Sequence, residues 1–176
     1  FSSSATVYGE PQHLPINENH PLFPNNPYGQ SKLQVEQILT SYCFSNPSFK
    51  CVSLRYFNPA GAHESGLIGE NPKGIPNNLF PYIFQVAIGK RKNLNIFGND
   101  YPTKDGTGVR DYIHIKDLVE GHISALDFLI NLTKGSNKNR PDNQKNNFTF
   151  NLGTGRGFSV MEIVETYKKV SGINIP

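Results

Sequence analysis

The stretch Cys51-Val52-Ser53-Leu54-Arg55-Tyr56-Phe57 is the clearest strand in the sequence. It is rich in β-branched and aromatic residues, and Asn58-Pro59 ends it. Upstream, residues 28–42 show helical spacing, residues 9–27 form a Pro- and Asn-rich loop, and residues 5–9 are expected to end another strand. A strand, helix and strand in this order indicate a right-handed crossover between parallel strands.

The same alternation continues downstream of a long loop over residues 61–76. A stretch from Thr133 to Asn147 is too polar to pack, so we expect a surface excursion there. The remaining expected elements are a helix over 78–89, strands over 94–97 and 109–115, a helix from Lys116, a strand over 148–152 and a helix from Ser159. This order predicts an α/β fold with a largely parallel sheet.

Composition excludes several classes of protein. The 176 residues are 36% hydrophobic and 18% charged, which suits a packed core and argues against a disordered chain. The net charge of +3 comes from 17 basic and 14 acidic residues that are scattered along the chain. Since no basic stripe forms, we expect no nucleic-acid partner.

Cysteine usage and hydropathy favour a cytoplasmic protein. Cys43 and Cys51 match neither a disulfide framework nor a metal-ligand spacing, so we expect reduced structural thiols and no metal site. No apolar run approaches the roughly 18 to 20 residues that span a bilayer. We therefore expect no membrane partner.

Tyr28 and Lys32 are the first candidates for chemistry. They lie four residues apart at the start of the expected helix, so both side chains rise from one face. A cation near a phenol oxygen stabilises the phenolate, which can then act as a base. Ser2-Ser3-Ser4 should emerge at the same sheet edge, where a hydroxyl can bond a substrate oxygen. The plainer alternatives are chance helical spacing and serines that bond only local backbone.

Longer motifs give these residues a context. The runs over residues 4–9, 27–32 and 54–61 (SATVYG, PYGQSK and LRYFNPAG) resemble the extended short-chain dehydrogenase/reductase family. The runs over 74–79 and 98–114 resemble, within that family, the epimerases that interconvert UDP-glucose and UDP-galactose. Related dehydratases place an acidic residue just after the strand-end hydroxyl, where this chain has Ala5 and Thr6. The resemblance therefore favours an epimerase.

The resemblance implies a role for each matched residue. Tyr28 would be the acid/base, Lys32 would stabilise its phenolate and contact the nicotinamide ribose, and Ser4 would bridge the sugar's 4-hydroxyl. The implied contacts of the NAD cofactor are Tyr28, Lys32, Tyr56, Phe57, Ser2 and Ser3. The implied contacts of the UDP-sugar are Ser4, Asn58, Asn77, Asn78, Leu79, Asn95, Phe97, Arg110 and Tyr112.

Arg110 is the expected partner of the diphosphate, because a guanidinium pairs well with phosphate oxygens. A salt bridge to the neighbouring Asp111 is the plainer alternative. Residues 153–157 (GTGRG) superficially suggest a dinucleotide-binding loop, but the third glycine is misplaced for that fingerprint. We expect a structural turn there, with Ser159 as the N-cap of the next helix.

The resemblance also implies a domain organisation. Residues 1–60 would be the C-terminal part of an NAD-binding Rossmann domain, and residues 61–176 mostly the UDP-sugar-binding region, with elements returning to the sheet. The fold class would be a partial Rossmann-like α/β sheet without its N-terminal dinucleotide-binding half, because no glycine-rich cofactor loop precedes Ser2. We expect a fragment that is inactive alone and whose full-length parent is a homodimer.

The implied chemistry is NAD-dependent oxidation of the sugar to a 4-keto intermediate, followed by reduction on the opposite face. Two alternatives stay open. One is a non-catalytic module that binds UDP-sugars without turning them over. The other is an epimerase of the same family that acts on UDP-N-acetylhexosamines or UDP-pentoses.

Overall fold

The computed structural model describes residues 1–134 and 145–176, and its first sheet is built around β2 (Cys51–Tyr56). β1 (Ser2–Ser4) and β5 (Asn147–Leu152) flank β2, and all three strands are parallel. In the register, Ser4 lies beside Tyr56, and Tyr56 beside Leu152. The strand ends therefore meet at one edge, as the sequence predicts.

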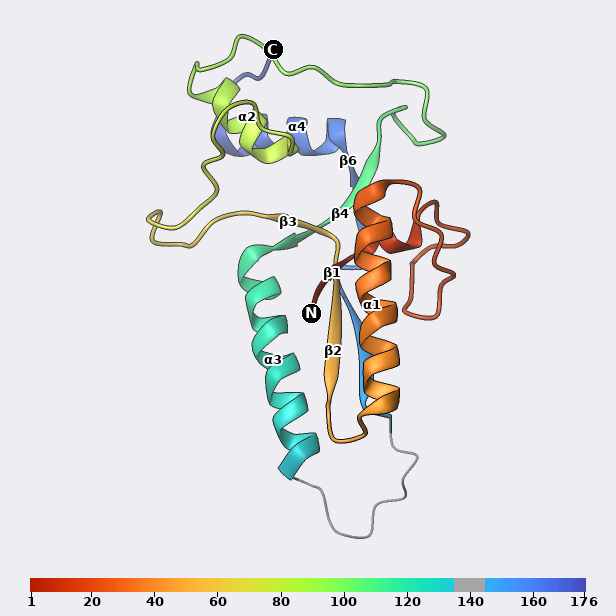
Figure 1. Cartoon of the computed structure of the whole chain (residues 1–176). Helices are drawn as coiled ribbons and strands as arrows, with labels where there is room; N and C mark the ends of the chain where they lie inside the picture. The colour runs from red at the N-terminus through yellow and green to blue at the C-terminus, as the bar shows by residue number, and fades with distance from the viewer. Residues whose placement is uncertain (135–144) are drawn as a thin grey trace.

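Two long helices cover opposite faces of this sheet (Figure 1). On one side, α3 (Ile115–Lys134) packs on Val52 and Leu54 of β2. On the other side, α1 (Pro27–Ser45) packs on all three strands, and its Glu36 pairs with Arg55 of β2. Successive strand residues point to opposite faces, so β2 alternates between an apolar contact and a polar one.

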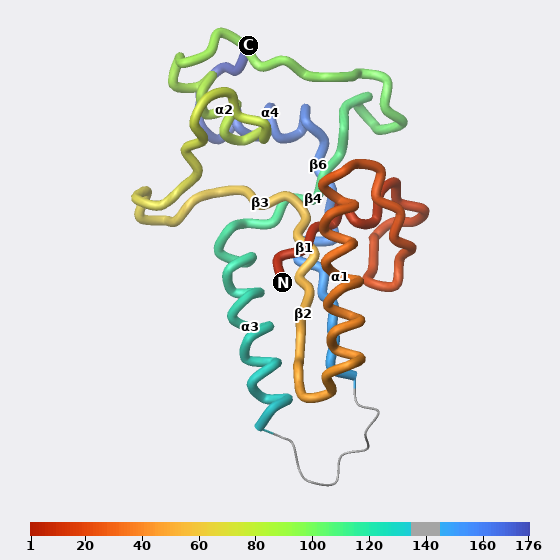
Figure 2. The backbone as a smooth tube through the Cα atoms, in the orientation of Figure 1, coloured from red at the N-terminus to blue at the C-terminus, as the bar shows by residue number. Residues whose placement is uncertain are grey.

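A second part of the molecule lies beyond the ends of these strands (Figure 2). The chain leaves β2, crosses into this part and returns through α3 to β5. Its core holds Ile83, Val86, Val164 and Ile175. Its elements are β3 (Asn58–Ala60), β4 (Val109–His114) and β6 (Gly157–Ser159), which form a second sheet, and the helices α2 (Leu79–Ala87) and α4 (Val160–Ser171).

Two expected elements differ from the structure. Residues 5–9 do not continue β1, because Ala5–Tyr8 forms a 3-10 helix, η1, capped by the Ser4 side chain. Residues 94–97 form no strand; the Leu94 amide instead donates one backbone bond, 2.8 Å long, to the Pro176 carbonyl. The expected end of the strand at Asn58-Pro59 is confirmed, because β2 stops at Tyr56 and residues 58–60 start a second sheet, where Asn58 pairs with β4.

The expected N-cap of the last helix is confirmed. Ser159 caps α4 in a capping box with Glu162, which satisfies otherwise unpaired amides of the first turn. Cys43 and Cys51 are free and buried, and burial raises the pKa of both thiols, which disfavours the reactive thiolate. Most of the polar stretch over 133–147 lies outside the described residues. Within the residues that are described, no helix is long and apolar enough to cross a membrane.

Candidate active site

The first turn of α1 places Tyr28 at the carboxyl edge of the first sheet. The Asn26 side chain caps the helix by accepting the Gly29 amide at 2.8 Å, and Pro27 occupies the first helical position. The helix begins very close to η1, because a Cβ on Gly29 would lie 2.6 Å from the Thr6 carbonyl oxygen. Gly29 thus permits the close approach that brings Tyr28 toward the end of β1.

Tyr28 and Lys32 form the pair that their spacing predicts. The Lys32 Nζ lies 5.5 Å from the centre of the Tyr28 ring and 5.4 Å from that of Phe1. It donates a 2.9 Å hydrogen bond to the Ser2 carbonyl oxygen. Tyr28 is 55% exposed, and within residues 1–134 and 145–176 its hydroxyl has no hydrogen-bond partner. A free phenol beside an ammonium group is therefore presented to solvent at this edge.

The three serines face three different partners. The Ser4 Oγ accepts the Thr6 amide at 3.2 Å and the Thr6 hydroxyl at 2.9 Å, so its own hydrogen remains available to donate. Ser3 is 1% exposed and donates to the Glu36 carboxylate. Ser2 is exposed, and its hydroxyl contacts that of Tyr56 at 2.7 Å. A cofactor contact of Ser3 would therefore have to come from its backbone.

A buried ionic network lies directly beneath these strand ends. Arg55 is 4% exposed and binds the Glu36 carboxylate through two nitrogens, at 2.6 and 3.0 Å. Its third hydrogen bond, 2.9 Å long, goes to the Tyr8 hydroxyl, which in turn donates to Asn151 of β5 at 2.6 Å. Burial disfavours the charge of Arg55, but its bonds to Glu36 and Tyr8 outweigh burial and raise its pKa. The network ties α1, η1, β2 and β5 together under the candidate site.

Several expected substrate contacts come together in the second sheet. Asn58 lies beside Tyr112 in the β3–β4 register, and Phe80 at the start of α2 packs edge-on against the Tyr112 ring. Burial raises the pKa of Tyr112, an effect that the positive charge of Arg110 opposes. Tyr112 therefore stays protonated at neutral pH and can donate a hydrogen bond.

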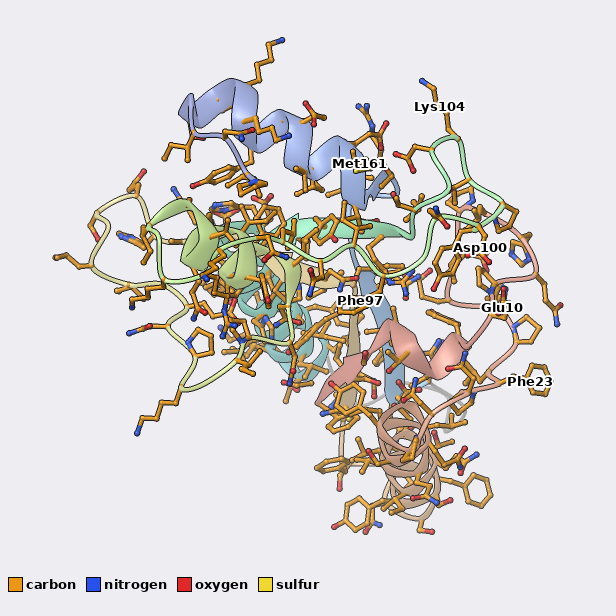
Figure 3. All side chains as sticks on the ribbon, turned by 90° about the horizontal axis from the view of Figure 1, so that it is seen from above. Glu10, Phe23, Phe97, Asp100, Lys104 and Met161 are labelled. Carbon is orange, nitrogen blue, oxygen red and sulfur yellow. The ribbon has the colours of Figure 1, made fainter. Side chains whose placement is uncertain are left out.

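The remaining expected contacts lie on or after the N-terminus of α2. Asn78 is its N-cap residue, with Asn77 before it, and Leu79 packs on the core of the second part. The Asn95 side chain bonds that of Asn93 at 2.7 Å, and Phe97 is 84% exposed. Seen from above, Phe97 lies toward the middle of the view (Figure 3). The structure thus gathers Asn58, Tyr112 and the start of α2, and leaves Asn95 and Phe97 on a neighbouring loop.

Asp111 does not pair with Arg110. Its carboxylate accepts the amides of Thr154 and Gly155 at 2.8 to 2.9 Å and the Thr154 hydroxyl at 2.7 Å. The glycine-rich segment over 153–157 is therefore a turn whose amides are occupied by an internal carboxylate, which confirms its structural assignment. Arg110 donates to the Val109 carbonyl at 2.7 Å and forms no ion pair with any residue the structure describes.

Two surface hollows lie away from these residues. One follows the outer face of α1 around Ile38 and Tyr42, and the other lies between Phe49 and Leu129. Both are shallow and open, and neither is lined by Ser4, Tyr28 or Lys32. The Tyr28 and Lys32 pair stays the candidate for acid/base chemistry at the sheet edge, and Tyr28 is 55% exposed there.

Sequence reasoning missed three residues that shape the site: Thr6, Gly29 and His122. Thr6 donates hydrogen bonds to Ser4, and Gly29 lets α1 pack closely against η1 because it has no side chain. The His122 Nε2 forms a hydrogen bond with the Tyr56 hydroxyl. A helix glycine directly after a candidate catalytic tyrosine is a signal for close packing. For His122 no local signal exists, because 66 residues separate it from Tyr56.

Comparison with known proteins places this geometry in a family. Residues 1–139 match the model of the NAD dependent epimerase/dehydratase family. The chain is 57% identical to a UDP-glucose 4-epimerase of Dictyostelium discoideum and 55% identical to one of Bacillus subtilis, over all 176 residues. It spans about half the length of these relatives, 48% in both cases.

Solved structures agree with the sequence comparison. The UDP-glucose 4-epimerase of Stenotrophomonas maltophila, with bound NAD and formylated UDP-arabinopyranose, superimposes with a TM-score of 0.90 at 46% identity. The Bifidobacterium longum enzyme, in complex with NAD+ and UDP, gives 0.87 at 51% identity. In each case all of this chain and 49% of the other chain are covered.

Proposed function

Because the chain belongs to the NAD dependent epimerase/dehydratase family, we propose that it supplies the acid/base half of a UDP-glucose 4-epimerase. The observation that carries this proposal is the exposed Tyr28 ring with the Lys32 Nζ 5.5 Å from its centre, at the end of parallel strands. The reaction would interconvert UDP-glucose and UDP-galactose. Residues 1–60 would belong to the cofactor domain and residues 61–176 mostly to the substrate region, with α3 and β5 returning to the first sheet.

The residues at this edge fit a dinucleotide cofactor. Lys32 is held by the Ser2 carbonyl rather than by a carboxylate within the described chain, so its charge is available to ribose hydroxyls. Tyr56 ends β2 at the same edge, and Phe57 follows it directly. NAD, when bound, takes up and returns the hydride at C4 of the sugar.

The proton steps follow from the side chains. Tyr28, as phenolate, would accept the proton of the sugar's 4-hydroxyl and later return it to the reduced product. Lys32 would stabilise that phenolate electrostatically. Ser4 already accepts two hydrogen bonds from Thr6, so its hydrogen is free to point at the same sugar oxygen. Phenol and serine would then hold one oxygen from two sides throughout the transfer.

Inversion at C4 requires the sugar to turn over while the nucleotide stays fixed. Arg110 supplies an exposed guanidinium for the diphosphate, and Tyr112 and Asn58 supply neighbouring polar groups. A charged and polar grip on UDP, with few groups for the hexose, would permit that rotation. The full protein's cytoplasmic location and homodimeric state stay predictions; exposed Ile38 and Tyr42 on α1 support a dimer contact.

The decisive test is a chimera in which residues 1–176 replace the matched segment of the Dictyostelium discoideum relative. We expect the chimera to interconvert UDP-glucose and UDP-galactose. Tyr28→Phe should lower kcat by about 10²- to 10⁴-fold, the usual contribution of a positioned acid/base group. The matched control is Tyr42→Phe on the same helix, which should leave kcat unchanged. Full activity of the Tyr28→Phe chimera would contradict the assignment.

Binding and turnover measurements distinguish this proposal from two alternatives, a non-catalytic module and an epimerase for other UDP-sugars. A non-catalytic module would bind UDP tightly without NAD, which isothermal titration of the 176-residue chain measures. An epimerase of different specificity would turn over UDP-N-acetylglucosamine or a UDP-pentose faster than UDP-glucose in the chimera. We expect weak UDP binding by the chain and a preference of the chimera for UDP-glucose.

A further inference from the structure

A chain of hydrogen bonds links α3 to the Tyr28 and Lys32 pair across the sheet. The His122 Nε2 bonds the Tyr56 hydroxyl, and the Tyr56 hydroxyl lies 2.7 Å from the Ser2 Oγ. The Ser2 carbonyl oxygen then accepts the Lys32 ammonium at 2.9 Å. The path thus joins α3, β2, β1 and α1, with the Ser2 side chain bonding Tyr56 and the Ser2 backbone carbonyl bonding Lys32.

The chemistry of the groups gives this path a direction. The His122 Nδ1 lies 2.8 Å from the Leu118 carbonyl oxygen, which can only accept, so Nδ1 carries the hydrogen. In the neutral ring Nε2 is then an acceptor and takes the Tyr56 hydroxyl hydrogen. Because hydroxyl hydrogens rotate, the Ser2 hydroxyl can donate to the Tyr56 oxygen. In this arrangement the His122 Nδ1, the Tyr56 hydroxyl and the Ser2 hydroxyl each donate one hydrogen bond to one acceptor.

The path ends at the hydrogen bond that holds the Lys32 ammonium. Within the described residues, the Ser2 carbonyl is the one polar partner of the Lys32 ammonium, whose other contacts are the Phe1 and Tyr28 rings. β1 is held in the described sheet by its pairing with β2, and side-chain contacts between the two strands add to that pairing. The bond from Tyr56 to Ser2 is such a contact, and His122 fixes the Tyr56 hydroxyl.

We propose that His122 is a positioning residue for the acid/base pair, acting through Tyr56 and Ser2 to hold the Lys32 ammonium beside the Tyr28 ring. This inference rests on the proposed function for its kinetic consequence, but the positioning itself is a property of the chain. It also gives the Tyr56 hydroxyl a task distinct from contact with a cofactor. Removing His122 would release Tyr56, loosen Ser2 and let Lys32 leave Tyr28.

The kinetic test compares three variants of the chimera. His122→Phe keeps the ring volume but removes the acceptor, Tyr56→Phe removes the hydroxyl, and His122→Gln restores an acceptor. We expect His122→Phe and Tyr56→Phe each to lower kcat by about 3- to 30-fold, the range for residues coupled through a network. The double variant should lose no more than one single variant, because both remove the same path. His122→Gln should recover most of the loss.

A second readout does not need turnover. Acetylation of Lys32 by acetic anhydride, followed by peptide mass spectrometry, reports how firmly the ammonium is held. Lys116, ion-paired on the surface with Glu64 at 3.5 Å, is the internal reference. Relative to Lys116, Lys32 should be labelled at least about threefold faster in His122→Phe and Tyr56→Phe than in the parent chimera or His122→Gln.

The outcomes separate this inference from the proposed function. An inactive parent chimera would count against the function, while labelling of Lys32 would still decide the positioning. An active chimera with unchanged kcat and unchanged Lys32 labelling in His122→Phe would overturn the inference alone. Additive losses in the double variant would also overturn it, because they would show that His122 and Tyr56 act separately.

Discussion

At the scale of single residues, the site depends on a glycine as much as on its catalytic candidates. A side chain on Gly29 would meet the Thr6 backbone at 2.6 Å, and backbone cannot move aside cheaply. Gly29→Ala should therefore push the start of α1 away from η1 and separate Tyr28 from Ser4. We expect at least about a tenfold lower kcat in the chimera, since small misplacements of reacting groups cost up to about 10²-fold.

A matched control for this change is Ser31→Ala, two residues further along the same helix. The Ser31 side chain is exposed and donates a 2.7 Å hydrogen bond to the Tyr28 carbonyl. It should leave kcat near that of the parent chimera, and steady-state assays measure both variants. Equal activity of Gly29→Ala and Ser31→Ala would show that the close approach of α1 to η1 does not set the catalytic geometry.

The residue scale also shows how far sequence reasoning reaches. Tyr28 and Lys32 could be predicted because helical spacing alone puts them on one face. The separate roles of Ser2, Ser3 and Ser4 could not, because they depend on Tyr56, Glu36 and Thr6, and only Thr6 is close in sequence. A contact between distant residues leaves no local pattern in a single sequence.

At the scale of elements, some strands can be predicted from their local sequence and others depend on distant partners. β2 and β5 have β-branched and aromatic residues whose pattern predicts them, and the structure confirms both. β6 has only three residues and exists because Gly157–Ser159 pairs antiparallel with β4. Leu94–Phe97 has an apolar pattern but makes a single described backbone bond, with the C-terminal segment. Short strands are decided by their partners, which local sequence does not reveal.

Asp105 connects two elements and makes their docking sensitive to pH. Its carboxylate accepts hydrogen bonds from the Ser159 hydroxyl and from the amide and hydroxyl of Thr107, and these lower its pKa. Because the folded-state pKa is lowered, the charged Asp105 carboxylate stabilises the folded state at pH values above its ordinary pKa of 3.8. This contribution is lost as the pH falls through the lowered pKa of the folded state. The loop before β4 should therefore loosen from the α4 cap only in strong acid.

The corresponding variant is Asp105→Asn in the chimera. We expect a lower midpoint of thermal unfolding than in the parent at pH 7, and a difference that shrinks as the pH is taken below 3.8. Differential scanning fluorimetry across this range gives both values. Asp100→Asn, on the same loop, is the control and should leave the unfolding midpoint at pH 7 near that of the parent. A constant difference at every pH would mean that the charge of Asp105 does not matter.

At the scale of the whole molecule, the described chain has more apolar surface than its own elements cover. α3 uses Ala125 and Phe128 against β2, yet Val119, Ile123 and Leu126 are 51 to 58% exposed. Their spacing of four and three residues forms a stripe along the helix. β1 pairs on one side only within the described sheet. An apolar stripe and an open strand edge together favour association with other chains.

The 176-residue chain by itself should therefore be inactive and self-associating, although it carries Tyr28 and Lys32. Because it spans 48% of its relatives, we expect most of the cofactor site to require residues outside this chain. Sedimentation velocity should show oligomers whose proportion rises with concentration, and Ile123→Lys should shift them toward monomer by placing a charge on the stripe. Coupled assays should detect no epimerase turnover, while the chimera turns over. A monomeric chain with measurable turnover would show that the Tyr28 and Lys32 pair needs no partner segment to complete its site.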